Sequence, residues 1–210
     1  MPVLLRTIFL LSLSTLIVAC ATPSLEDQPS AEFGDANLYP VNNSGFQQAF
    51  VARDAGLASY RSIDAAPLEL AGLQMPTTAI RGTQRRDLQM TPERETAFQE
   101  EWAKAMDAAF RGYDLGGQAK ISLKIEARLI KIEPGLRTAM TIGGTAQPMA
   151  DALDISAEFR LSDAGSGRLL AVIRDTRSIT AGALSRTAPA TLNQLFGSWA
   201  ALLHTRVSGR

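Results

Sequence analysis

Few residues in this 210-residue chain could do chemistry. The chain holds one cysteine, Cys20, and one histidine, His204, beside 21 acidic and 21 basic side chains. With a single histidine, neither a histidine-based metal site nor a Ser-His-Asp triad can be built except around that one ring. The sequence therefore predicts no metal, no cofactor and no catalytic residue, and Cys20 becomes the main candidate for a functional role.

Cys20 follows a short basic segment and an apolar run. Residues 1–6 include one arginine, and residues 7–18 are apolar apart from hydroxyl side chains. This layout is typical of a secretory signal peptide, and the run is shorter than the roughly 20 residues that a membrane-crossing helix needs. Residues 16–20 read LIVAC and resemble the lipobox of bacterial lipoproteins. The alternatives are an exported protein with a chance cysteine and an uncleaved anchor.

The lipobox resemblance implies a lipid attachment at Cys20. It implies a diacylglyceryl thioether on the sulfur, cleavage before Cys20 and acylation of the new amine, for instance with palmitate. Two or three acyl chains hold a protein on a membrane durably, whereas one does not. Ala21 is not the aspartate associated with inner-membrane retention, so the resemblance favours the outer membrane, with the protein facing the periplasm.

Composition divides the chain into three parts. Residues 1–19 are the expected signal peptide, and residues 20–37 are the lipidated cysteine and a tether, rich in Pro, Ser, Asp and Glu, that we expect to be flexible. Residues 38–210 are long enough for a single periplasmic domain. The balanced charge and the lack of a basic stripe argue against nucleic acid as a partner.

Two amphipathic helices are predicted. Thr91 and Pro92 are good first residues for a helix over 91–111, whose apolar stripe recurs every four residues. A second helix is expected over 189–207. The stripes are Phe98, Trp102, Met106 and Phe110 in the first helix, and Leu192, Leu195, Phe196, Trp199, Leu202 and Leu203 in the second. The carboxylates Glu100 and Glu101, and the ring of His204, are expected on solvated faces.

Strand-like alternation is clearest over residues 119–132. Pro134-Gly135 is predicted to turn the chain, so that 136–142 returns as a second strand. A hairpin is expected around residues 163–167. In its predicted register Leu161, Phe159 and Ala157 pair with Leu169, Ala171 and Ile173, and Arg174, Asp175 and Arg177 lie on the exposed face. A weaker edge strand is expected within residues 59–73, next to Pro67.

These elements together predict an α+β fold. Two amphipathic helices would cover one face of a mostly antiparallel sheet, as a two-layer sandwich, and the other face would stay polar.

Several short motifs taken together resemble an uncharacterised family of proteobacterial lipoproteins defined by a domain of unknown function. The motifs are the lipobox, Ser44-Gly45-Phe46, Tyr60-Arg61-Ser62-Ile63, a helix ending in Tyr113, the hairpin of residues 163–171 and the closing segment of residues 199–203. The chain departs from the family at residues 64–67, where a fuller apolar strand is usual. Membership implies a cell-envelope lipoprotein and no known reaction.

Two classes of function follow. The first is a non-enzymatic binding or scaffold lipoprotein, whose partners are membrane lipid through acylated Cys20 and an envelope protein. The second is an envelope hydrolase that uses loop carboxylates such as Asp151 and Asp154. Acid-base catalysis needs two groups held in different environments, and the sequence does not indicate such a pair.

The lipid attachment predicts the behaviour of a Cys20→Ala variant. Without the thiol no diacylglyceryl group can be added, so we expect the variant to lose incorporation of labelled palmitate and to leave the membrane fraction. Fractionation of cells followed by immunoblotting measures both effects. A variant that stayed membrane-bound and fully processed would contradict the lipoprotein interpretation.

Overall fold

A computed structural model describes residues 22–77, 89–115, 121–140, 146–180 and 189–209. The side chains of residues 136–140 and 146–151 lie outside this description. The elements are β1 (Ser24–Leu25), η1 (Ala31–Ala36), β2 (Leu38–Asn42), β3 (Gln48–Ala52), η2 (Leu57–Ser59), β4 (Ser62–Ala65), α1 (Pro92–Ala109), β5 (Asp114–Leu115), β6 (Ser122–Met140), β7 (Ala146–Asp163), β8 (Leu169–Thr180) and α3 (Pro189–Ser208).

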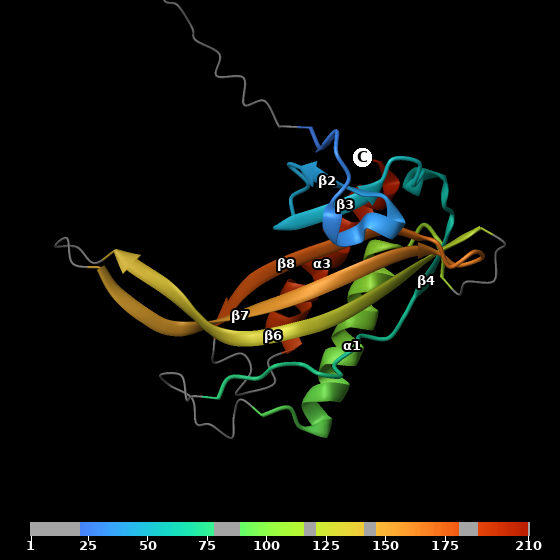
Figure 1. Ribbon diagram of the computed structural model, residues 1–210. Coiled ribbons are helices and arrows are strands. Elements are labelled where there is room, and N and C mark those ends of the chain that lie inside the picture. The colour runs from blue at the N-terminus through green and yellow to red at the C-terminus, as the bar shows by residue number, and fades with distance from the viewer. Residues whose placement is uncertain (1–21, 78–88, 116–120, 141–145, 181–188, 210) are drawn as a thin grey trace, which may run out of the picture.

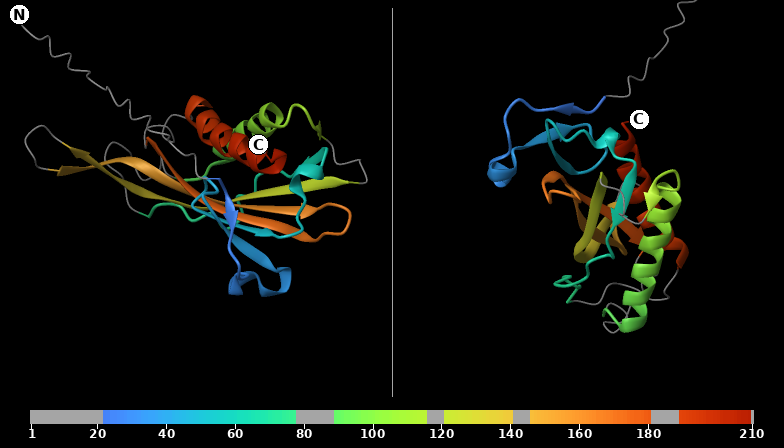
Figure 2. Two further views of the ribbon diagram at one scale, coloured as in Figure 1. Left: turned by 90° about the horizontal axis from the view of Figure 1, so that it is seen from above. Right: turned by 90° about the vertical axis from the view of Figure 1, so that its right-hand side faces the viewer.

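The strands form an eight-stranded sheet in the order β1-β2-β3-β8-β7-β6-β4-β5. Neighbouring strands are antiparallel except β4, which is parallel to both β5 and β6. Helices α1 and α3 lie side by side on the same face of the sheet (Figures 1 and 2). The predicted α+β sandwich, with two helices on one face of a mostly antiparallel sheet, is thus confirmed.

Helix α1 begins as its sequence predicts. The Thr91 side chain accepts a hydrogen bond from the Arg94 N–H, and Pro92 occupies the first turn. The apolar stripe faces the sheet, with Phe98, Trp102 and Met106 buried. Phe110, just after the helix, is also fully buried.

Helix α3 places its stripe on the same core. Phe196 packs edge-on against Phe98 of α1, with the ring centres 5.8 Å apart. Leu192, Leu195 and Leu203 are buried, and Leu202 is half-buried against Gly45. The periodicity therefore predicted both the extent and the inner face of this helix.

Phe159 of β7 is at the centre of the core. Its ring stacks on Trp102 of α1 at 6.0 Å and meets Trp199 of α3 edge-on at 5.5 Å. Phe46 reaches the same ring from the segment before β3, at 6.3 Å. One side chain thus joins the central strand to both helices and to the N-terminal strands.

The predicted turn at Pro134-Gly135 is wrong, because β6 runs straight through it to Met140. Pro134 pairs with Leu153 of β7. The Ile132 N–H points away from β7, to Gln74, and position 134 faces the same way, so the missing N–H of Pro134 removes no bond to β7. A Cβ atom on Gly135 would lie 2.6 Å from Oδ1 of Asp154. A side chain at position 135 would therefore have to displace the Asp154 carboxylate, and glycine here makes room for a cross-strand neighbour and does not form a turn.

The hairpin joins β7 to β8 as predicted, but its register differs. Leu161 pairs with Ala171 and Phe159 pairs with Ile173, two residues away from the predicted pairing. The shift arises at a bulge beside Ser162 and in a turn closed by bonds between Asp163 and both Gly167 and Arg168. A two-residue shift keeps each side chain on its face, so the predicted inner face is unchanged.

Asp175 lies on the inner face, because it alternates in phase with the inward residues Ala171 and Ile173 in either register. It lies opposite Ala157 on the helix-covered face and is 5% exposed, so the prediction of an exposed Asp175 is wrong. Arg177 is half-buried on the same side, with its Nε 2.6 Å from Oδ2 of Asp175. Arg174 instead points to the outer face, where Nε donates to Glu158 at 2.8 Å.

Residues 24–37 are folded against the sheet, in contrast to the flexible tether expected there. Strand β1 pairs with β2, and η1 packs Phe33 against Phe50, with 5.0 Å between the ring centres. Arg174 of β8 donates to both oxygens of Glu32, at 2.6 and 3.1 Å. Composition alone misses this segment because its contacts come from residues far along the chain.

The weak strand expected within residues 59–73 is present only in part. Strand β4 is four residues long, and the chain after it touches β6 through isolated bridges at Glu69 and Gln74. Pro67 interrupts the strand, as expected of an edge position.

The position of Phe159 predicts a contrast between two neighbours on β7. Phe159→Ala leaves a cavity between both helices and should lower the free energy of unfolding by about 3–5 kcal/mol. Arg160→Ala removes an exposed side chain from the other face and should change it by less than about 0.5 kcal/mol. Urea denaturation followed by circular dichroism measures both. Equal losses of unfolding free energy in the two variants would contradict a core that lies on one face of the sheet.

Candidate functional site

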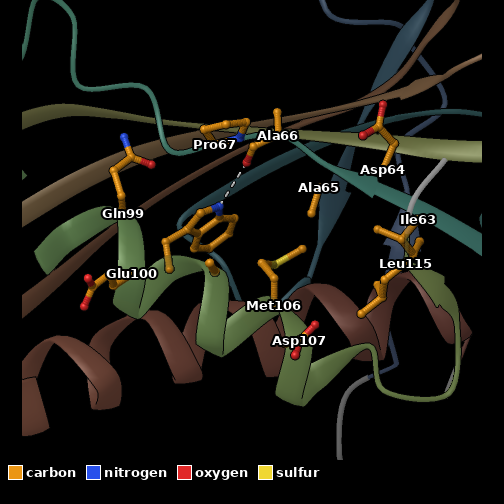
Figure 3. Close-up of a pocket in the computed structure, with 12 residues that line it drawn as sticks. Ile63, Asp64, Ala65, Ala66, Pro67, Gln99, Glu100, Met106, Asp107 and Leu115 are labelled. Carbon is orange, nitrogen blue, oxygen red and sulfur yellow. Dashed lines mark hydrogen bonds between the residues drawn. The ribbon is translucent and has the colours of Figure 1, made fainter. Parts of the chain in front are cut away.

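A groove of about 730 Å³ lies between helix α1 and the edge of the sheet (Figure 3). Residues 63–67 form one wall and α1 forms the other, and Leu115 of β5 lies at one end. The surface is mainly apolar and includes Ala65, Ala103 and Met106. Leu115 is 38% exposed, which makes it one of the few large apolar side chains left open to solvent in the described part of the chain.

Two side chains of α1 hold the helix at this edge. The Gln99 amide spans the backbone of Leu68: the Leu68 N–H donates to Oε1 at 2.9 Å, and Nε2 donates to the Leu68 carbonyl at 2.5 Å. Trp102 donates from Nε1 to the carbonyl of Ala66 at 3.3 Å. Gln99 thus makes the pair of bonds that a neighbouring strand would make.

Ala65 is the last residue of β4 and lies between these fixed points. In a parallel pair of strands, alternate residues direct their N–H and C=O groups to the same neighbour. The Ala66 N–H donates to Ile125 of β6 at 2.9 Å, so Ala65 faces away from β6. Strand β5 pairs only with Ser62 and Ile63, and no strand within the described ranges pairs with Ala65 on that side.

Three carboxylates border the groove. Asp64 lies on the strand wall, and Glu100 and Asp107 lie on the helix wall. Figure 3 shows Asp64 and Asp107 on opposite walls, without their carboxylates pointing toward one another. No basic side chain is among the described residues that line the groove. Such an arrangement can bury an apolar side chain and attract a cation, but it does not bring two carboxylates to one reacting atom.

Two lysines adjoin residues of the groove lining: Lys104 follows Ala103 in α1, and Lys124 pairs with Asp64 in the β4–β6 ladder. Lys104 Nζ lies 2.7 Å from Glu101 and 3.9 Å from Glu100. Lys124 has its Nζ 2.6 Å from Oε1 of Glu126. Both ammonium groups are therefore held mainly by carboxylates outside the groove lining.

Glu101 is buried, so its predicted place on a solvated face is wrong. Its Oε1 accepts from Lys104 and its Oε2 accepts from Asn193 of α3 at 3.3 Å. The hydrogen bond from Lys104 holds the pKa of Glu101 below its ordinary value. Glu101 joins the two helices, and its contact with Asn193 could not be predicted because it depends on how α3 is placed. Glu100 is exposed as predicted.

His204 is half-buried and not freely solvated as expected. Its ring meets Phe110 and Tyr113 edge-on, with ring centres 5.4 and 5.9 Å away. These aromatic neighbours come from the end of α1, so His204 serves packing between the two helices and lies outside the groove.

The other residues singled out from the sequence lie elsewhere. Cys20 is outside the described residues, and so is the side chain of Asp151. Asp154 accepts a hydrogen bond from Ser178 at 2.5 Å and is not among the residues lining the groove. The structure therefore gives no account of lipid attachment and does not bring Asp154 into the candidate site.

Asp175 forms a second polar cluster, which sequence reasoning missed. Oδ2 accepts from Trp199 Nε1 at 2.8 Å as well as from Arg177, and Oδ1 accepts from the Gln47 N–H at 2.9 Å. These bonds satisfy the buried carboxylate and join β8 to α3 and to the segment before β3. The only signal in the sequence was an acidic residue at an inward position of β8.

In the described ranges, no group of three or more His, Cys, Asp or Glu side chains is placed to hold a metal ion. None of the helices in those ranges is long and apolar enough to cross a membrane.

No protein-family model matches this sequence, and no curated protein matches it either. The fold is similar to several solved structures. A DUF330 protein from Xanthomonas campestris is 11% identical, with a TM-score of 0.41, over 72% of this chain and 90% of that one. A protein described as a lipoprotein from Caulobacter crescentus is 15% identical, with a TM-score of 0.35, over 74% and 91%.

A minor lipoprotein from Acinetobacter baumannii is 12% identical, with a TM-score of 0.36, over 71% of this chain and 94% of that one. The solved structures with a similar fold thus include lipoproteins and a protein of an uncharacterised family. At these identities and TM-scores the likeness carries no argument about activity or partner.

The Gln99 amide predicts a local loss of stability on substitution. Gln99→Ala removes both bonds to Leu68 and should lower the free energy of unfolding by about 1–2 kcal/mol, with faster amide exchange at Leu68. Glu100→Ala, on the exposed neighbour, removes only a 3.9 Å contact with Lys104 and should cost less than about 0.5 kcal/mol. Thermal denaturation and hydrogen exchange measure the two effects. Unchanged exchange at Leu68 would contradict the role of Gln99.

Proposed function

We propose that this protein is a lipid-anchored, non-enzymatic binding lipoprotein of the outer membrane. It is held through acylated Cys20, faces the periplasm and binds an envelope partner in the groove between α1 and β4. The observation that carries the proposal is the groove itself, because it combines an apolar surface with a strand edge at Ala65 that no strand in the described ranges pairs with. Sites that bind partners characteristically combine an apolar surface with a few polar groups that fix orientation.

The sheet order supports this arrangement. Strand β1, which follows the proposed anchor, is at one edge of the sheet, whereas β4 is next to the other edge. Six strand spacings separate β1 from β4, which corresponds to roughly 30 Å. An anchor at the β1 edge therefore leaves the groove free for a periplasmic partner.

The contacts of Asp154 favour binding over the hydrolase alternative. Its carboxylate is bonded to Ser178 and lies outside the groove. General acid-base catalysis needs a second group poised near the same reacting atom. The proposal is therefore that the protein acts by holding its partner and does not transform it.

Two exposed alanines on α1 provide a matched test. Ala103 lines the groove, whereas Ala108 is exposed on the same helix but does not line it. A photo-crosslinking amino acid at position 103 should give a discrete light-dependent adduct in intact cells, and the same group at position 108 should not. Immunoblotting of cell-envelope fractions measures the adducts.

Two results would oppose this proposal. Equal adducts from positions 103 and 108 would mean that the groove is not the binding surface. Turnover of an ester or cell-wall substrate by the purified protein, with loss of that activity in Asp151→Asn, would overturn the non-enzymatic part.

A further inference from the structure

We propose that the groove binds an extended peptide segment of a partner protein, in which basic residues alternate with apolar ones, and that this segment adds a strand to β4 at Ala65. The inference rests on the proposed function in one respect, namely that the groove is a binding site. It goes further by naming the chemistry of the occupant and the way it is held.

The backbone of Ala65 selects an extended peptide. Its N–H and C=O groups face away from β6, beyond the two positions at which β5 pairs with β4. On either side of Ala65 the edge is already occupied: β5 pairs at Ile63, and Trp102 and Gln99 bond to Ala66 and Leu68. An added strand would complete the edge with main-chain bonds, as in recognition by β-strand addition.

The surroundings of Ala65 on the two faces of the sheet determine which kinds of side chain alternate along the peptide. Side chains along a strand point alternately to opposite faces of the sheet. Toward the helices, an incoming side chain would meet Met106 and the exposed Ala103, which favour an aliphatic group. Toward the other face, the next side chain would emerge beside Asp64, which pairs with Lys124 in the β4–β6 ladder. A pattern of aliphatic and polar residues therefore fits both faces.

Asp64 favours lysine or arginine at the polar positions, because its carboxylate lies on the face of the sheet to which those side chains point. Asp64, Glu100 and Asp107 border the groove, and no basic side chain is among the described residues that line it. Lys104 and Lys124 do not remove this bias, since each lies 2.6 to 2.7 Å from a carboxylate outside the lining, Glu101 or Glu126. A cationic segment would also be attracted over a distance of about 10 Å at moderate salt.

The same charges argue against a second copy of this chain. Two copies joined edge to edge at β4 would bring their Asp64 and Asp107 carboxylates toward each other, which is unfavourable. A small apolar ligand would fill the space beside Met106 but would make no hydrogen bonds to the backbone of Ala65.

The test uses the full chain purified from bacterial membranes in mild detergent. The probe is a short labelled peptide that alternates lysine and valine, and fluorescence anisotropy measures its binding. Controls are a glutamate-valine peptide of the same length and a peptide with the same lysines and valines in two blocks. We expect only the alternating basic peptide to bind, and its affinity should fall as salt is raised.

Two substitutions at one position test strand addition. Ala65→Pro removes the outward N–H, while the β4–β6 bonds, which use the neighbouring residues, remain. It should weaken binding of the basic peptide roughly tenfold. Ala65→Ser keeps the N–H and a small side chain, and should change the affinity by less than about twofold. Circular dichroism checks that both variants are folded.

A second pair of substitutions tests the need for an acidic residue in the groove, without changing the backbone of Ala65. Asp64→Asn should weaken binding of the basic peptide by up to about fivefold, as expected for a partly exposed ion pair. Asp35→Asn, in the exposed η1 segment far along the sheet from the groove, should leave it unchanged. This pair keeps the proposal testable even if Ala65→Pro does not fold.

The outcomes separate this inference from the proposed function. Equal binding of all three peptides, or no effect of both Ala65→Pro and Asp64→Asn, would overturn strand addition by a basic segment. If no peptide binds while position 103 still gives its specific adduct in cells, the inference fails and the groove remains a binding site. If the adduct is also lost, the proposed function fails with it. Self-association that depends on Ala65 would identify a second copy as the occupant and overturn the inference.

Discussion

The burial of Phe159 between Trp102 and Trp199 is the contact on which the rest of the fold depends. The central strand β7 has a helix-covered face and a polar face, so both helices must lie on one side. Aromatic rings of this size bury large areas, and edge-on or offset pairs add to that gain. Once α1 is fixed over Phe159, its outer side necessarily overhangs the short strand β4, and the groove is formed there.

The handling of the sheet edge explains why the groove is not closed. Natural sheets protect exposed edges with prolines, short strands or covering side chains. This chain uses all three within residues 62–68: β4 ends at Ala65, Pro67 cannot donate, and Gln99 and Trp102 bond to Leu68 and Ala66. The edge groups of Ala65 are left out of this protection, within the described part of the chain. Because the rest of this edge is covered, the uncovered backbone of Ala65 in the described part of the chain is the place where a partner could add to the sheet.

The sequence predicted those features that depend on local periodicity. Both helices, their buried faces and the inner face of the β7–β8 hairpin follow from spacings of 3.6 and two residues. Features that depend on distant partners were missed. The extended course of β6 past Gly135 depends on its pairing with β7, the burial of Glu101 depends on Asn193, and that of Asp175 depends on Trp199. The groove belongs to this second group, since Gln99 and Leu68 are neighbours only in space.

The contact of Arg174 with Glu32 and Phe33 has a consequence for how the protein stands on a membrane. Because residues 24–37 are held against the sheet, the chain between a lipidated Cys20 and Ser24 spans at most about 14 Å. If Cys20 carries the proposed lipid, so short a connection would let the folded domain tilt about its β1 edge but would keep it close to the bilayer. Its long β6–β7 ribbon would then sweep a limited arc, and partners would meet it within a thin layer above the lipid headgroups.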